Sequence, residues 1–116
     1  MSYMLLIIEP TGQRTTRPLQ QGKELYQRML DYAASLRAEG VLVESNSLRT
    51  DDALRLTVRS GKSSVTDGPF TEAKELVGGF FLLNCQTREQ ALEYAQQCPA
   101  AEWATVEVRG VGPCYL

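Results

Sequence analysis

The run Val77-Gly78-Gly79-Phe80-Phe81-Leu82-Leu83-Asn84-Cys85 decides the fold of this 116-residue chain. It is apolar at consecutive positions, and so is the opening run at residues 3–9. Successive side chains of a β-strand point to opposite faces of a sheet, and a face that meets water carries polar residues. We therefore predict that both runs are inner strands of a sheet covered on both faces. Gly78 and Gly79 are expected to relieve a bulge or a close approach between strands.

Two amphipathic helices are predicted between the strands. Apolar residues recur at helical spacing through residues 22–39, and Gly40 stands where a left-handed C-terminal cap belongs. Thr87-Arg88-Glu89-Gln90 has the spacing of a capping box, in which the Thr87 side chain accepts from the helix and the Gln90 side chain answers the Thr87 amide. The second helix begins there and ends at Pro99.

The remaining segments complete a recognisable order of elements. Val41-Leu42-Val43 restarts a strand after Gly40. Alternating residues around Ser60-Gly61-Lys62 predict a half-exposed β-hairpin at residues 54–66, and the same alternation predicts a last strand at 104–109. Without the inserted hairpin the order is β-α-β-β-α-β, which is typical of a ferredoxin-like α+β fold with both helices on one face. We expect one domain over residues 1–110 and a C-terminal tail at 111–116.

The second apolar face of this sheet has no helix left to cover it. An exposed apolar patch of that size on a monomer marks an association surface. We therefore predict face-to-face packing with a second copy of the chain, which makes the protein a homodimer.

Composition excludes several classes of function. Twelve basic and fourteen acidic residues give a net charge of −2 and a pI near 5.1, so we expect no binding to nucleic acid. The chain has no histidine, which removes Ser–His–Asp and Cys–His catalysis and histidine metal sites. No metal and no cofactor is predicted.

The cysteines and the apolar runs bear on the compartment. Cys85, Cys98 and Cys114 form no C-x-x-C pair, and their odd number fits a reducing cytosol. The opening residues lack the charged segment of a signal peptide, and no run approaches the roughly 20 apolar residues of a membrane span. We expect a cytoplasmic protein that does not enter a membrane.

The segment Val65-Thr66-Asp67-Gly68-Pro69-Phe70-Thr71-Glu72-Ala73-Lys74-Glu75-Leu76-Val77-Gly78-Gly79-Phe80 resembles the signature of the DGPF branch of YCII-related proteins. The opening Tyr3-Met4-Leu5-Leu6-Ile7, the Ala91-Leu92-Glu93 helix with its Cys98-Pro99-Ala100-Ala101 end, and the closing Val106-Glu107-Val108-Arg109 match as well. The resemblance implies a dimeric α+β barrel, in which two ferredoxin-like sheets close around a shared interior.

The same resemblance says less about activity. Most DGPF-branch proteins have no assigned function, and the His–Asp pair proposed as catalytic in some YCII relatives is absent from a chain without histidine. Genes of this branch often neighbour those of extracytoplasmic-function sigma factors, which implies a regulatory setting and a functional link to such a factor.

Asp67 is the leading candidate for chemistry. A carboxylate at a strand break beside a Gly-Pro turn can face a cleft and act as a general base. The alternative is that Asp67 bonds the amides of its own turn, which is the commoner role of such a residue.

Candidate ligand-binding residues are drawn from several segments. Arginines that converge on a cleft bind carboxylate or phosphate, and aromatic side chains line small-molecule pockets; a wet strand face or packing in the core or dimer interface is the alternative role for each. The candidates are Tyr3, Arg59, Phe70, Phe80 and Arg109, with Tyr26, Trp103 and Tyr115 as further aromatic residues.

The sequence thus predicts a small-molecule-binding or regulatory module with a cleft near Asp67. The alternative is a small lyase or isomerase that uses Asp67 as general base, with Arg59 or Arg109 holding an anionic substrate.

Overall fold

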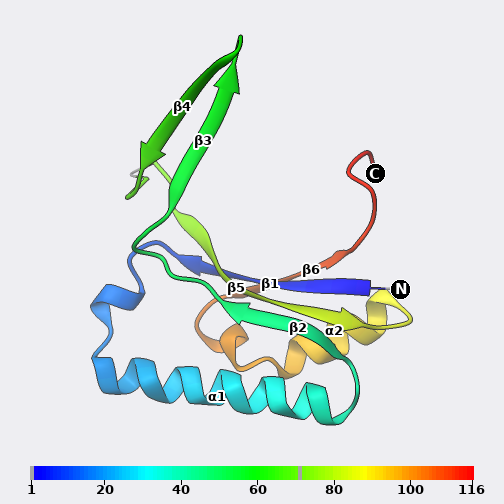
Figure 1. Ribbon diagram of the computed structural model, residues 1–116. Coiled ribbons are helices and arrows are strands. Elements are labelled where there is room, and N and C mark those ends of the chain that lie inside the picture. Colours follow the sequence, from blue (N-terminus) through cyan, green and yellow to red (C-terminus); the bar gives the residue numbers. More distant parts are fainter. Residues whose placement is uncertain (1, 71) are drawn as a thin grey trace.

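A four-stranded antiparallel sheet forms the centre of the computed structural model, which describes residues 2–70 and 72–116. Two helices follow the first and third of these strands, so the order is β-α-β-β-α-β and the spatial order of the strands is β2-β5-β1-β6 (Figure 1). The ferredoxin-like α+β prediction is confirmed. The elements are β1 Ser2–Pro10, η1 Arg14–Thr16, α1 Leu19–Ala38, β2 Leu42–Ser47, β3 Leu54–Arg59, β4 Lys62–Asp67, β5 Glu75–Asn84, α2 Arg88–Gln97, η2 Pro99–Glu102 and β6 Thr105–Gly110.

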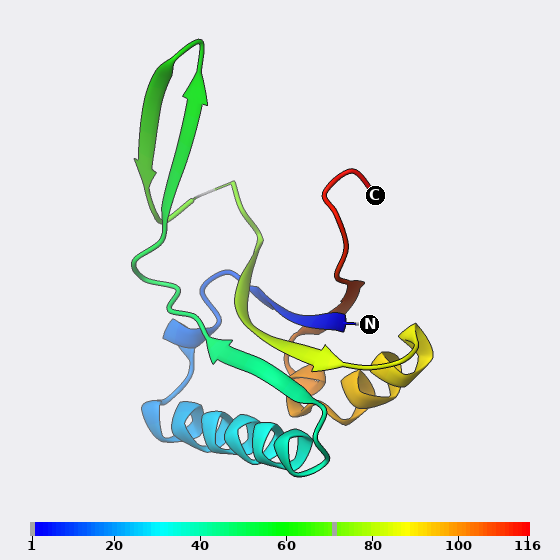
Figure 2. The same cartoon turned by 45° about the vertical axis from the view of Figure 1, so that its right-hand side comes forward.

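Both helices lie on one face of the sheet, and the core fills the layer between them (Figures 1 and 2). Leu5 of β1 and Leu83 of β5 are fully buried there, together with Leu36 of α1 and Ala91 of α2. Alternation along β1 places Leu5 and its neighbours two residues away on the helical side. Burial of these side chains supplies the main stabilisation of the domain.

The opposite face of the sheet carries no helix (Figure 1). Met4 and Leu6 of β1 alternate with the core residues and pair with Leu82 and Phe80 of β5. All four are only half-buried. The two-sided apolar pattern therefore reflects one face closed by helices and one face open in the single chain.

The predicted hairpin is present as a separate two-stranded sheet of β3 and β4. Ser60 and Gly61 both have positive φ, 51° and 77°, as the tight turn between twisted strands requires. One detail differs from the half-exposed hairpin that we expected. Every residue of β3 and β4 is exposed, because the hairpin projects away from the body of the domain (Figures 1 and 2).

The helix ends show which local signals were sufficient. Gly40 has φ +73° after α1, so the predicted left-handed cap is confirmed, whereas the helix begins earlier than expected, directly after Pro18. At α2 the Thr87 hydroxyl accepts from the Gln90 amide at 3.1 Å. The Gln90 side chain accepts instead from the Gln86 amide at 2.8 Å, so the predicted return to Thr87 is wrong.

None of the described helices combines the length and the apolarity needed to cross a bilayer.

Candidate functional site

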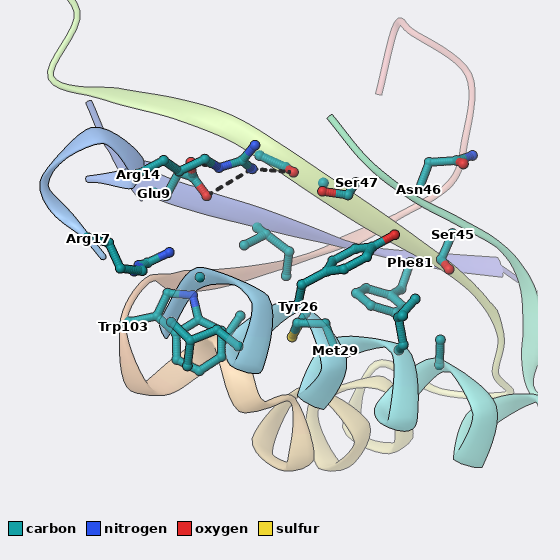
Figure 3. Close-up of a pocket in the computed structure, with 18 of the residues that line it drawn as sticks. Glu9, Arg14, Arg17, Tyr26, Met29, Ser45, Asn46, Ser47, Phe81 and Trp103 are labelled. Carbon is teal, nitrogen blue, oxygen red and sulfur yellow. Dashed lines mark hydrogen bonds and ion pairs between the residues drawn. The ribbon is translucent and has the colours of Figure 1, made fainter. Parts of the chain in front are cut away.

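A pocket of about 540 Å³ lies between the helical face of the sheet and α1 (Figure 3). Its volume is within the range of small-molecule sites. Apolar side chains from the sheet, from α1 and from the end of η2 line its interior, and polar groups gather along one rim. The interior includes Ile7, Leu25, Met29, Ala33, Phe81 and Trp103, and the rim includes Glu9, Arg14, Arg17, Tyr26, Ser45, Asn46 and Ser47.

Glu9 and Arg14 form an ion pair at the rim. Arg14 Nε lies 2.8 Å from Glu9 Oε1, and Glu9 is buried at 5% exposure. The same guanidinium donates to the carbonyl of Leu48 at 2.7 Å and to that of Gly78 at 3.0 Å. Arg14 therefore connects η1 to β1, to β5 and to the segment that leads into the hairpin. Most of its N–H donors already bind protein acceptors.

The pair of glycines in β5 makes room for this arrangement. A Cβ at Gly78 would overlap the Glu9 carboxylate and would lie 2.8 Å from an Arg14 nitrogen. A Cβ at Gly79 would lie 3.0 Å from the backbone oxygen of Asn46 on the neighbouring strand. The β1–β5 register also shifts at this point, between Ile7 and Ile8. The predicted bulge and close approach of strands are confirmed.

Arg17 differs from Arg14 in its partners. Its side chain is half-buried at the pocket, and it makes no hydrogen bond or ion pair with any residue in the described parts of the chain. Figure 3 shows the Arg17 guanidinium and the Tyr26 ring reaching into the space between α1 and the sheet. Arg17 is thus a cation that faces the pocket with its donors unused.

Trp103 closes the end of the pocket near η2. Arg28 of α1 stacks over the indole, with its Cζ 5.5 Å from the ring centroid, and also forms a bidentate ion pair with Glu102. Gln13 donates to the Trp103 carbonyl at 2.6 Å. These contacts connect α1, η1 and η2 around one aromatic wall.

Two titratable groups behind the pocket belong to the core. The Tyr32 hydroxyl donates to the Tyr94 carbonyl at 2.6 Å, and burial raises the pKa of Tyr32 well above its usual value. Burial likewise raises the pKa of the Cys98 thiol. Both groups stay protonated at neutral pH and act as packing residues.

The predicted site residues fall outside this pocket. Asp67 and Arg59 lie in the exposed hairpin, and the Asp67 carboxylate has no hydrogen-bond partner among residues 2–70 and 72–116. Phe70 lies near the base of the hairpin, where Arg55 stacks on it at 3.9 Å. Arg109 pairs with Met4 in the sheet, on the open face with Phe80, and Tyr3 packs against the core and beside Gly110. The structure does not bring these residues to one site.

Tyr26 and Trp103 are the sequence candidates that do line the pocket. Glu9 and Arg14 were missed. A signal for Glu9 was present in the alternation of β1, because Glu9 continues the buried series of Leu5 and Ile7 with a charged residue. A carboxylate at a buried strand position needs a cationic partner, and Arg14 is the next basic residue in the chain.

No group of three or more His, Cys, Asp or Glu side chains in residues 2–70 and 72–116 is placed to hold a metal ion.

Comparison with solved structures shows a similar fold in 5-chloro-2-hydroxyhydroquinone dehydrochlorinase (TftG) from Burkholderia phenoliruptrix AC1100, in complex with 2,5-dihydroxybenzoquinone. The TM-score is 0.55 at 14% identity, over 97% of this chain and 94% of the other. That likeness concerns the fold alone.

Comparison with curated proteins gives "Uncharacterized protein R00369" from Rhizobium meliloti (strain 1021), which is 38% identical over 56 residues. The match covers 48% of this chain and 45% of the relative, so the chain spans less than half of that protein's length. Assignment to the DGPF branch stays a prediction, whereas the family itself is shown. A family model for the YCII-related domain matches residues 1–114, and the chain belongs to the YCII-related domain family.

Proposed function

We propose that the chain binds a small, planar, anionic molecule, such as an aromatic carboxylate or a hydroxylated quinone, in the pocket between α1 and the sheet. The observation that carries this proposal is Arg17, a half-buried cation that faces an aromatic pocket and has no partner within the described residues.

The apolar walls favour a flat ligand. Tyr26, Phe81 and Trp103 present aromatic surface from three different elements, and a cavity of about 540 Å³ accommodates a molecule of one or two rings. Aromatic side chains bury large apolar area against such rings and prefer offset or edge-on contacts with them. The pocket walls therefore favour a planar ligand over a long, flexible one.

The rim favours oxygen substituents. Arg14 is committed to Glu9 and to two backbone carbonyls, whereas the planar fork of Arg17 remains available for a carboxylate or an ionised hydroxyl. Ser45, Asn46 and Ser47 contribute further polar groups on the strand side of the rim. A ligand with an anionic group at one end and a ring at the other satisfies both sides.

The neighbouring structure guides the choice of probe. The ligand in the TftG complex, 2,5-dihydroxybenzoquinone, is a single planar ring with acidic hydroxyl groups, which is the chemistry that the pocket would recognise. We use this compound as a probe of size and charge, not as the assigned ligand.

Calorimetric or NMR titration tests the proposal. The wild type should bind 2,5-dihydroxybenzoquinone or benzoate and should bind neutral benzyl alcohol more weakly. Arg17→Gln should lower the affinity for the anions roughly 10- to 100-fold, because a charged hydrogen-bonding partner is lost. Arg37→Gln, at an exposed position near the end of α1 that does not line the pocket, is the matched control. Equal binding by both variants, or no binding of any probe, would overturn the proposal.

The enzymatic alternative keeps Asp67 as a general base with Arg59 or Arg109. In a single copy Asp67 is exposed and lies outside the pocket lining, so this alternative needs a cleft that another molecule completes. Binding is therefore the function that the geometry supports best. The functional link to an extracytoplasmic-function sigma factor remains a prediction, as does the cytoplasmic location.

Assembly into a homodimer is proposed on a different observation. The open face of the sheet presents Met4, Leu6, Phe80 and Leu82, and an apolar sheet face is stable when a second layer covers it. Packing of two such faces would give the α+β barrel that the family resemblance implies. Light scattering at micromolar concentration tests this directly, and a folded monomer would contradict it.

A further inference from the structure

The β3–β4 hairpin is an arm that has no supporting layer in its own chain. All twelve strand residues are exposed, and the arm rises from the side of the sheet opposite the helices (Figures 1 and 2). An isolated two-stranded hairpin is marginally stable in water at best, and three strands or a packed face are needed for independent stability. The arm therefore requires a cover that the single chain does not provide.

One face of the arm is apolar over its middle, with Ser63 near the turn and Asp67 at the base, and the other face is polar. Leu56 pairs with Val65 across the two strands, and alternation places Leu54 and Val58 on the same face. These four side chains are 54–63% exposed. The opposite face carries Thr57 paired with Ser64, together with Arg55, Arg59 and Lys62. A ribbon with one apolar face is built to lie on another surface.

Charge indicates the kind of surface that receives the arm. Residues 54–67 contain three basic residues and one acidic residue, whereas the rest of the chain contains nine basic and thirteen acidic residues. The arm is thus basic and the body is acidic. Because the arm projects away from its own body, the acidic body that it can reach is that of another copy.

We propose that in the homodimer the hairpin of each protomer clasps the body of the other, with the face of Leu56 and Val65 buried against the partner and the basic face at the rim. This inference rests on the dimer proposed above and deepens it. The arm projects from the same side of the molecule as the open sheet face, opposite the helices (Figure 1). The clasp is therefore continuous with the proposed sheet interface. Two-fold symmetry supplies two identical clasps.

The base of the arm allows a clean experiment. The Gly68 amide donates to the Ala53 carbonyl at 3.1 Å, so the two ends of the hairpin meet. Residues 54–67 are therefore replaced by a Gly-Ser linker, since none of them lines the pocket or pairs with the four-stranded sheet. Leu56→Ser with Val65→Ser removes only the apolar contact, and both positions are already exposed in the single chain. Thr57→Ser with Ser64→Thr exchanges the cross-strand pair on the opposite face and is the matched control.

Sedimentation equilibrium and hydrogen exchange read out the clasp. The serine pair should raise the dimer dissociation constant about a hundredfold or more, since two protomers lose four buried side chains, and the exchanged pair should leave it unchanged. Amides of residues 54–67 in the wild type should be protected at high protein concentration and lose protection on dilution. Added salt should weaken the dimer, because the arm and the body carry opposite charge.

Three results would overturn the clasp. A hairpin-replaced variant with the same dimer dissociation constant as the wild type would leave the sheet-face dimer standing and remove the arm from it. Hairpin amides that exchange equally in dimer and monomer would do the same. A wild type that stays monomeric at roughly 100 µM would end both proposals, and the arm would then be a docking element for a different partner.

Discussion

The ion pair between Glu9 and Arg14 rests on the backbone of Gly78: Arg14 Nε is 2.8 Å from Glu9 Oε1, and Arg14 Nη2 donates to the Gly78 carbonyl at 3.0 Å. Glu9 and Arg14 are five residues apart, but Gly78 is 64 residues beyond Arg14. The rim of the pocket therefore depends on a contact between distant segments. The absence of a side chain at residue 78 is what lets the pair lie flat on β5.

Gly78→Ala should destabilise the domain by about 1–3 kcal/mol, because the new methyl group displaces the Glu9 carboxylate from its guanidinium and strains the strand. Thermal or urea unfolding measures this change. Gly22→Ala is the matched control, since its Cβ would meet only Arg17 Cδ at 3.9 Å and Gly22 lies inside α1. That substitution should raise stability by roughly 0.5–1 kcal/mol. The same sign for both variants would contradict the contact described here.

Thr87→Ala should cost about 1 kcal/mol, because the Gln90 amide loses the hydroxyl that accepts its hydrogen bond at the start of α2. Gln90→Ala should cost less, since the Gln86 amide that it releases is at an exposed position that water can reach. Gln96→Ala on the exposed surface of the same helix serves as the control. Denaturant unfolding gives all three values, and an unchanged midpoint for Thr87→Ala would show that the cap is not needed.

The three thiols should differ sharply in reactivity. Cys114 is exposed, whereas Cys85 and Cys98 are buried and burial raises the pKa of both thiols. A colorimetric disulfide reagent at neutral pH should therefore modify one thiol per chain rapidly and the other two only as the protein unfolds. Cys114→Ser should remove the fast phase. Two fast thiols would be inconsistent with the burial of α2 against the sheet.

The buried thiols also set an alkaline limit on stability. Their folded pKa lies above the unfolded value, so the folded chain binds its protons more tightly. The stabilisation is fully present below the unfolded pKa, near 8.5, and is lost as the pH rises from there toward the folded value. Unfolding free energy should fall over this window, and Cys98→Ala should reduce the slope while lowering stability at pH 7.

Substitutions at Asp67 test whether the hairpin takes part in ligand binding at the pocket. Its carboxylate has no partner among the described residues, so Asp67→Asn and Asp67→Ala should each change stability by less than about 0.5 kcal/mol. Neither should alter binding of an anionic probe in the pocket between α1 and the sheet. Titration and thermal unfolding of both variants check this, and loss of probe binding in Asp67→Asn would return the site to the cleft predicted near Asp67.

The local elements were predictable because their causes lie within a few residues. Consecutive apolar residues indicated β1 and β5. Gly40 marked the end of α1 through its backbone preference, and Thr87 marked the start of α2 through a short-range hydrogen bond. The glycines of β5 also announced a close approach. The order of these elements was enough to indicate the ferredoxin-like fold, and the motif at residues 65–80 carried the resemblance to the family.

The candidate site was not predictable in the same way. Asp67 was selected for its place beside a Gly-Pro turn, but the pocket forms where the first turns of α1 meet the edge of the sheet, and its wall includes Trp103 from the far end of the chain. What decides whether a charged side chain is spent or available is its tertiary partner. Arg14 and Arg17 are three residues apart, yet Arg14 binds Glu9 and two backbone carbonyls while Arg17 faces the pocket with no hydrogen-bond partner among the described residues. Hydrogen bonds and burial across the fold make that difference, and the local pattern of β1 signals only that Glu9 needs a cationic partner.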